Sequence, residues 1–194
     1  MSATPGKRAI ILDRDGTIIV DHGYLDDPAR ISFLPGALEG LRLWHERGHP
    51  LIVISNQSGI GRGRLTRAQV LGINERMQQL LRTAGAPLAG IWFCPHAPED
   101  GCECRKPGTR LVQEAAAQLG FDPAQSVVIG DKSSDIELGE HLGAITMLLS
   151  ANGQTSDGIA AHPDHVVASL LEAARITEQL GDGAPAPRRN PLTA

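Results

Sequence analysis

The chain has 194 residues, of which 41% are hydrophobic and 21% charged, with a formal net charge of -4. These values are typical of one globular domain with a substantial core, and the negative charge gives no reason to expect nucleic acid or an anionic membrane as a partner. No apolar run approaches the ~18 residues that span a bilayer, and the first residues lack the apolar region of a signal peptide. We therefore expect a cytoplasmic protein, and we expect it to be a monomer.

Short apolar runs alternate along the chain with longer segments of helical periodicity. Strands are expected over 9–12, 51–54, 91–93, 127–129 and 145–149, and helices over 37–47, 66–83, 108–119, 135–142 and 166–180. This alternation predicts an α/β fold with a doubly wound, Rossmann-like, mainly parallel sheet and flanking helices. One domain is expected over residues 1–180. The proline-rich segment 181–194 is expected to be a disordered tail.

Two carboxylates, Asp13 and Asp15, follow the first apolar run. A run of this kind is typical of a buried parallel strand, whose end lies at the sheet edge where open α/β folds bind ligands. Residues two apart on an extended backbone point to the same side, and Gly16 permits a sharp turn after them. Two like charges so close require a cation between them or a proton on one of them. The pair indicates a magnesium site or a nucleophile beside a general acid; taken alone, it could also be an acidic turn.

Polar residues also follow the second and fourth runs. The segment 55–63 offers a hydroxyl, backbone amides and glycines suited to a phosphate, although taken alone it could be a flexible loop. Asp131 ends the fourth run as Asp13 ends the first, so the two carboxylates would converge on a hard cation if their strands are neighbours. Asp135 suits the cap of the helix that follows.

After the third run, Cys94 and His96 are followed by Cys102 and Cys104. Three thiolates and one imidazole form a closed tetrahedral set for Zn²⁺, which is the structural rather than the catalytic pattern. The site would staple the loop 94–104 and hold the two cations that follow it, Arg105 and Lys106, near the strand ends. Three incidental cysteines and a surface histidine are the alternative.

Taken together, four segments resemble the ordered motifs of the haloacid dehalogenase superfamily: Asp13-x-Asp15-Gly16-Thr17, Ser55, Lys106, and Gly130-Asp131-x-x-x-Asp135. The resemblance covers residues 9–150 and implies an Mg²⁺-dependent phosphatase that forms an aspartyl-phosphate intermediate. It implies that Asp13 attacks the phosphorus and that Asp15 protonates the leaving oxygen and later deprotonates water. Ser55 and Lys106 would hold the phosphoryl oxygens. Mg²⁺ would bind Asp13, Asp131 and the backbone carbonyl of Asp15.

The segment Cys-Pro-His…Cys-x-Cys-Arg-Lys-Pro is similar to a zinc-loop subgroup without a large cap domain. Segments 20–24 and 56–63 resemble those of its heptose bisphosphate phosphatases, which implies a small phosphorylated sugar as substrate and hydrolysis of its C7 phosphate. Arg105 would bind the phosphate that is not cleaved. The residues implied to contact substrate are Asp21, His22, Gly23, Tyr24, Ser55, Asn56, Gln57, Ser58, Arg105, Lys106 and Lys132. Histidinol phosphate is the alternative substrate. A non-catalytic sugar-phosphate-binding protein and a phosphotransferase or mutase are less favoured.

Overall fold

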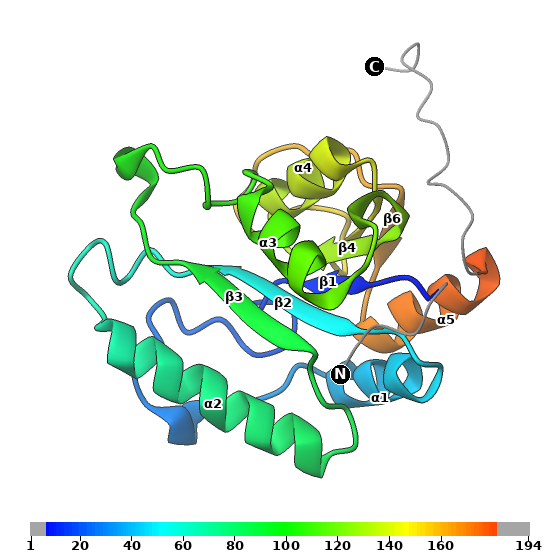
Figure 1. The fold of residues 1–194 in the computed structure, drawn as a ribbon, viewed down its shortest axis with the longest axis horizontal. Coiled ribbons are helices and arrows are strands. Elements are labelled where there is room, and N and C mark those ends of the chain that lie inside the picture. Colours follow the sequence, from blue (N-terminus) through cyan, green and yellow to red (C-terminus); the bar gives the residue numbers. More distant parts are fainter. Residues whose placement is uncertain (1–6, 182–194) are drawn as a thin grey trace.

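The computed structural model describes residues 7–181, and within them six parallel strands form one sheet (Figure 1). The strands are β1 (Ile10–Leu12), β2 (Leu51–Asn56), β3 (Gly90–Cys94), β4 (Val127–Gly130), β5 (Ile145–Leu149) and β6 (His165–Val167). Their order across the sheet is β3-β2-β1-β4-β5-β6. The order reverses direction beside β1, which has β2 on one side and β4 on the other. This is the doubly wound arrangement predicted from the sequence, and it places the reversal where such folds bind ligands.

The connections between strands carry helices. The α-helices are α1 (Ala37–Glu46), α2 (Arg67–Thr83), α3 (Arg110–Leu119), α4 (Ser133–Leu142) and α5 (Leu170–Leu180), and short 3₁₀ turns span Pro28–Arg30, Pro98–Asp100 and Pro123–Gln125. Within residues 7–181 no extra domain is inserted between these elements. None of the helices in this range combines the length and the apolar character that crossing a membrane would require.

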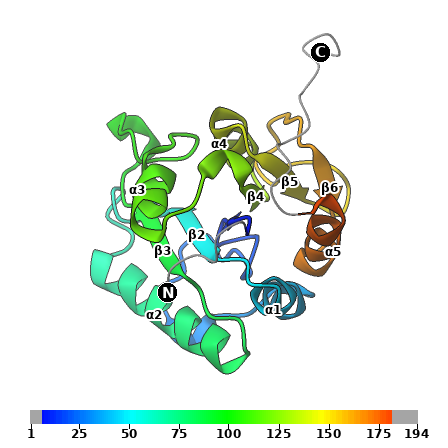
Figure 2. The same ribbon diagram turned by 45° about the vertical axis from the view of Figure 1, so that its right-hand side comes forward.

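Both faces of the sheet are covered by helices (Figure 2). Ile10 and Leu12 of β1 pack in a core with α1, α2 and α5, whereas Ile11 packs in a second core with α3 and α4. Successive residues of a strand point to opposite faces, so a strand buried on both faces must be apolar throughout. The continuous apolar runs of the sequence therefore have a direct cause in this layered arrangement.

One predicted boundary is wrong by more than two residues. The helix expected over 166–180 begins only at Leu170, because His165–Val167 form the edge strand β6 beside β5. Val166 is 48% exposed while Val167 is buried, which is the alternation of an edge strand. The short strand joins an apolar helix after two residues, so the helical pattern appeared to continue through it. The predicted tail, apart from Gly181, lies outside the described residues.

Candidate active site

The predicted acidic residues gather at the carboxyl edge of the sheet. Asp13 follows β1, and Asp131 follows β4, its neighbour in the sheet. The backbone N–H of Asp13 donates to the carbonyl of Ile129 at 3.0 Å, so the two strands remain paired up to this point. Carboxylate oxygens of Asp13, Asp131 and Asp135 all lie within 4.8 Å of one another. The expected convergence of the carboxylates is confirmed.

The turn after the acidic pair depends on Gly16. Its φ is 81°, a left-handed conformation that residues with a Cβ atom rarely adopt. A Cβ atom at this position would lie 2.4 Å from Oδ2 of Asp131. Glycine therefore permits both the sharp turn and the close approach of this turn to the Asp131 carboxylate.

A cavity of about 540 Å³ opens at this edge, a size suited to a small-molecule ligand. The predicted residues that line it are Asp13, Asp15, Asp21, Gly23, Tyr24, Asn56, Gln57, Ser58, Arg105, Lys106 and Lys132. Two predicted contact residues are not part of the lining: His22 is exposed to solvent, and Ser55 is 2% exposed. The lining also includes Gly59 and Arg62, which lie in the segment 55–63 predicted to suit a phosphate, and four residues for which no contact was predicted, namely Ser133, Ser134, Asp157 and Ile159.

Lys106 is the central cation of the site. Its Nζ atom lies 2.7 Å from Oδ1 of Asp13 and 2.6 Å from Oδ1 of Asp135, and it donates to the carbonyl of Ile54 at 2.8 Å. Burial alone would lower the pKa of Lys106, but the two carboxylates outweigh it and raise that pKa. Burial would likewise raise the pKa of Asp13, yet Lys106 and Lys132 hold it below its ordinary value. The site thus keeps a buried carboxylate anionic beside a buried cation, as a nucleophile that attacks phosphate requires.

Asp13 and Asp131 are the carboxylates expected to bind a divalent cation. Asp135 is held by buried Lys106 through Oδ1 and by a backbone N–H at the start of α4 through Oδ2 at 3.1 Å, whereas the two oxygens of Asp131 accept from the hydroxyls of Thr17, at 3.4 Å, and Ser156. The Asp131 carboxylate is oriented by the hydroxyl of Ser156, whose backbone N–H also donates to the Asp131 carbonyl at 2.7 Å. Burial and the nearby charge of Asp13 raise the pKa of Asp131. Such closely spaced hard oxygen donors fit Mg²⁺.

The side-chain amides of Asn56, the last residue of β2, and Gln57, which follows it, form hydrogen bonds within the site. Asn56 accepts from the backbone N–H of Lys106 at 2.9 Å and donates to its carbonyl at 3.2 Å, which fixes the Lys106 backbone. Gln57 donates to Oδ2 of Asp15 at 2.8 Å and to Oγ of Ser55 at 2.7 Å. Because Ser55 accepts this bond, its own hydroxyl proton is available to another acceptor, such as a phosphoryl oxygen.

The predicted segment 20–24 forms part of the cavity wall. Asp21 lies 3.4 Å from Nζ of Lys132 and accepts from the backbone N–H of Gly23 at 2.7 Å. The Tyr24 hydroxyl accepts from Arg62 at 3.3 Å, which joins this segment to the loop after β2. Charged and hydrogen-bonding groups of this kind suit a ligand with several hydroxyl and phosphate groups.

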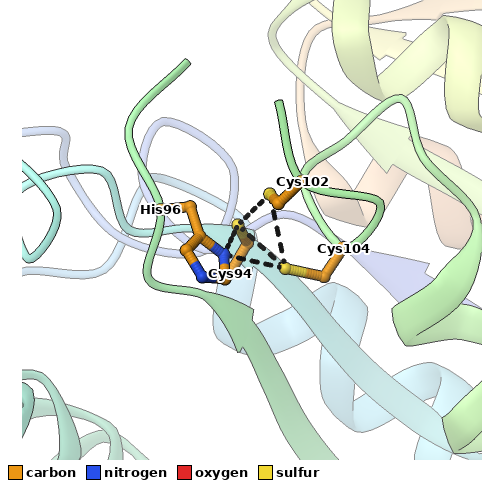
Figure 3. A group of neighbouring side chains, drawn as sticks. All are labelled: Cys94, His96, Cys102 and Cys104. Carbon is orange, nitrogen blue, oxygen red and sulfur yellow. Dashed lines mark hydrogen bonds between the residues drawn. The ribbon is translucent and has the colours of Figure 1, made fainter. Parts of the chain in front are cut away.

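The four predicted zinc ligands lie in one cluster (Figure 3). The three sulfur atoms lie 3.5 Å (Cys94 to Cys102), 3.2 Å (Cys94 to Cys104) and 3.6 Å (Cys102 to Cys104) apart, and Nδ1 of His96 lies 3.2 Å from Sγ of Cys104. Ligands bonded to tetrahedral zinc at ~2.0–2.3 Å would be separated by roughly 3.4–3.8 Å. The donor types of the cluster therefore fit a Zn²⁺ ion, and its separations of 3.2–3.6 Å overlap this range and extend about 0.2 Å below it.

The thiols of the cluster differ in acidity. Burial raises the pKa of Cys94 to about 12. Cys102 is affected by burial in the same direction, but hydrogen bonds from Cys94 and Cys104 outweigh it and lower its pKa to about 7. Since the thiolate is the metal ligand, the lowered pKa of Cys102 favours the form that binds a cation.

The Cys–His cluster is tied by hydrogen bonds to the loop that follows β2 and lines the cavity. The backbone N–H of Gln57 donates to the carbonyl of Cys94, and that of Gly61 donates to the carbonyl of Pro95, both at 2.8 Å. Arg105 and Lys106 directly follow Cys104. The cluster is therefore placed to fix two sides of the cavity at once.

Sequence reasoning assigned no role at the site to Arg14, Ser156 or Asp157, and regarded Asp135 mainly as a helix cap. Arg14 is buried against Asp15 at 2.9 Å. Asp157 lines the cavity and accepts from the backbone and hydroxyl of Ser133 at 3.1 and 2.9 Å. The position of Arg14 between the two acids was the single available signal. The other contacts arise from a loop after β5 that carries no recognisable pattern.

Residues 103–173 match the family model described as HAD-hydrolase-like, where HAD stands for haloacid dehalogenase. The D-glycero-beta-D-manno-heptose-1,7-bisphosphate 7-phosphatase of Yersinia pestis is 38% identical over 178 residues, which are 87% of this chain and 94% of that protein. The protein of the same name from Haemophilus influenzae is 34% identical over 90% of this chain and 98% of its own length.

Solved structures agree with this similarity. A D,D-heptose 1,7-bisphosphate phosphatase from B. bronchiseptica, complexed with magnesium and phosphate, has a TM-score of 0.81 at 29% identity and covers 90% of this chain and 99% of its own. A D,D-heptose 1,7-bisphosphate phosphatase from Burkholderia thailandensis has a TM-score of 0.65 at 27% identity and covers 88% of this chain and 97% of its own. The chain therefore belongs to the haloacid dehalogenase superfamily and, within it, to the family of D-glycero-β-D-manno-heptose-1,7-bisphosphate 7-phosphatases.

Proposed function

We propose that this protein removes the C7 phosphate of D-glycero-β-D-manno-heptose 1,7-bisphosphate by way of a phosphorylated Asp13. The observation that carries the proposal is a second cation, Arg105, in the same cavity as Lys106. Lys106 is occupied by Asp13 and Asp135, whereas the buried Nη1 of Arg105 has no hydrogen-bond partner among the described residues. A buried donor of this kind favours a ligand that brings a second anion.

In the first step, a carboxylate oxygen of Asp13 bonds to the phosphorus while the bond from phosphorus to the C7 oxygen breaks. Asp15 gives a proton to the leaving oxygen, and Ser55 and Lys106 donate to the phosphoryl oxygens. In the second step, water attacks the same phosphorus, Asp15 takes its proton, and phosphate leaves Asp13. Two displacements through an acyl phosphate replace one very slow hydrolysis, and positioning with charge neutralisation supplies most of the acceleration.

Two metal ions complete the proposal. Mg²⁺, held by Asp13, Asp131 and the backbone carbonyl of Asp15, would neutralise charge on the transferred phosphoryl group. Zn²⁺, held by Cys94, His96, Cys102 and Cys104, would have no open position for substrate and would act on structure alone. Neither ion changes the roles of the side chains described above.

Substrate choice follows from charge. The site offers Arg105 for the phosphate on C1, which remains on the product. Histidinol phosphate carries a cationic amine in place of a second anion, and Arg105 would repel it. The relatives of the family bear the name of the heptose enzyme, which supports the same choice.

A substrate panel tests the proposal. The two anomers of heptose 1,7-bisphosphate, histidinol phosphate and p-nitrophenyl phosphate would be compared by kcat/KM, with ³¹P NMR identifying the phosphate that is removed. We expect the β-anomer to be preferred and its C7 phosphate to be released. Equal or greater kcat/KM for histidinol phosphate would overturn the substrate assignment and leave the phosphatase chemistry intact. Absence of turnover on every ester would overturn both.

A further inference from the structure

Arg14 lies between Asp13 and Asp15 in the sequence and has no role in the steps described above. Its side chain is 2% exposed. A guanidinium stays charged in proteins, so its burial is costly unless anionic or polar groups surround it. Its partners come from three separate parts of the chain and meet beside the cavity.

The partners of Arg14 form a connected network. Nε lies 3.1 Å from Oδ2 of Asp15, and Nη2 lies 2.9 Å from Oδ2 and 3.2 Å from Oδ1 of the same carboxylate. Nη2 also donates to Oε1 of Gln57 at 3.0 Å, and Nη1 donates to Oδ1 of Asn74 on α2 at 2.8 Å. Gln57 in turn donates to Oδ2 of Asp15 at 2.8 Å. Asn74 is 7% exposed, so the far end of the guanidinium is fixed inside the protein.

The two oxygens of the Asp15 carboxylate are held unequally. Oδ2 accepts two hydrogen bonds, from Nε of Arg14 at 3.1 Å and from Gln57 at 2.8 Å, and also lies 2.9 Å from the charged Nη2 of Arg14. Oδ1 has one donor, at 3.2 Å. A carboxylate has about four lone-pair sites, two on each oxygen, so Oδ2 is saturated whereas Oδ1 keeps an acceptor site free. Asp15 also lines the cavity, where the leaving oxygen and the attacking water must lie.

We propose that Arg14 is a positioning residue that holds Oδ2 of Asp15, with Gln57, so that Oδ1 is the oxygen that exchanges the proton. This inference rests on the proposed phosphatase function. In the first step the proton on Oδ1 passes to the leaving oxygen as the P–O bond breaks and the bond from phosphorus to Asp13 forms. In the second step the proton of the attacking water returns to Oδ1 as phosphate leaves Asp13.

The geometry explains why an arginine serves here. Its planar fork contacts one carboxylate through two nitrogens and reaches Asn74 with the third, and this fixes the orientation of the carboxylate as well as its charge. A lysine would supply the charge without the fork. Arg14→Lys therefore removes the orientation and keeps the electrostatic attraction.

The test compares esters whose leaving groups differ in their need for a proton. p-Nitrophenolate leaves without protonation, whereas an alkoxide such as that of glycerol 3-phosphate does not. In Arg14→Lys we expect kcat/KM for the alkyl ester to fall ~10–100-fold, because general acid catalysis contributes ~10²–10⁴-fold in total. For p-nitrophenyl phosphate kcat/KM should change less than about threefold. The kcat of Arg14→Lys for p-nitrophenyl phosphate should fall, and a burst of p-nitrophenol should appear, because hydrolysis of the phosphorylated enzyme still needs Asp15.

Arg8 offers a matched control. It is also 2% exposed, but it donates to the carbonyls of Gly181 and Gln125 at the amino-terminal edge of the sheet, away from the cavity. Arg8→Lys should lower thermal stability without changing the ratio of kcat/KM between the two esters. If Arg14→Lys does not fold, Asn74→Ala removes only the brace on Nη1 and should change the same ratio about three- to tenfold.

Equal losses on both esters without a burst, in Arg14→Lys or in Asn74→Ala, would reduce Arg14 to a structural residue and overturn the inference. Wild-type protein that hydrolyses neither of these esters nor heptose 1,7-bisphosphate would instead overturn the proposed function, and this inference with it. The two failures are distinguishable because the first is seen only in the variants.

Discussion

Gly16→Ala is the substitution whose effect can be worked out most directly from the structure. At φ 81° a residue with a Cβ atom is strained by about 1–2 kcal/mol. The new Cβ atom would also lie 2.4 Å from Oδ2, 2.7 Å from Cγ and 2.9 Å from Oδ1 of Asp131. Ordinary van der Waals contact begins near 3.4 Å, so the carboxylate or the turn must move by about 1 Å (3.4 minus 2.4).

The substitution should have two effects that can be measured separately, one on stability and one on metal binding and rate. Backbone strain of 1–2 kcal/mol corresponds to a fall in Tm of roughly 2–8 °C for a domain of this size. A metal ligand moved by about 1 Å cannot keep the short, rigid bonds of Mg²⁺, and misplacement on this scale can reduce the rate ~100-fold. We therefore expect Gly16→Ala to fold, to bind Mg²⁺ at least tenfold more weakly by calorimetric titration, and to lose about two orders of magnitude in kcat.

Gly120→Ala is the control for this experiment. Gly120 follows α3 with φ 75°, and a Cβ atom there would have no neighbour within 4 Å. This variant should show the same loss of Tm with unchanged Mg²⁺ affinity and kcat. If Gly16→Ala keeps Mg²⁺ affinity and kcat within about threefold of wild type, the placement of Asp131 as a metal ligand beside the turn is wrong.

Three further predictions concern the cations of the site. Cys102→Ser, or removal of zinc by a chelator, should lower Tm and raise KM, because the cluster holds Arg105 and Lys106 in place. Metal analysis should find about one zinc per wild-type chain. A zinc-free protein with unchanged Tm and KM would contradict the structural role of zinc. Arg105→Ala should raise KM for the bisphosphate roughly ten- to a hundredfold, a loss of ~1.5–3 kcal/mol in binding, and should leave KM for p-nitrophenyl phosphate unchanged. Equal increases in KM for both substrates would contradict the role of Arg105 in binding the second phosphate. Asp135→Asn removes one of the two anionic partners of buried Lys106. The unfolding free energy, measured by denaturant titration, should fall by about 2 kcal/mol. An unchanged midpoint would show that this ion pair makes no net contribution to stability.

The sequence was sufficient to predict the sheet and the residues at its edge. Buried parallel strands are apolar on both faces, so β1, β2 and β4 stand out as short runs, and the polar and acidic residues at their ends must meet at one edge. The clustering of Cys94, His96, Cys102 and Cys104 was predictable because these residues are close in sequence. β6 was missed because three residues with one buried position give almost no periodic signal beside α5.

Contacts between distant residues could not be predicted in the same way. The network around Arg14 joins residues 57 and 74 to the first acidic motif, and no spacing along the chain reveals it. Asp135 has the pattern of a helix cap, and its pairing with Lys106 exists only because the zinc loop brings Lys106 to the sheet edge. Ser156 reaches Asp131 from an irregular loop, where neither periodicity nor a motif indicates proximity.

The proposed mechanism requires that Asp13 becomes phosphorylated during turnover. Asp15→Asn should form the acyl phosphate from p-nitrophenyl phosphate, whose leaving group needs no proton, and should hydrolyse it slowly because the base for water is absent. Rapid acid quench followed by peptide mass spectrometry should then find one phosphoryl group per chain on the peptide that contains Asp13, and none in Asp13→Asn. If the quenched Asp15→Asn enzyme has released p-nitrophenol but carries no phosphoryl group, or carries it on another residue, the result would contradict the phosphorylation of Asp13.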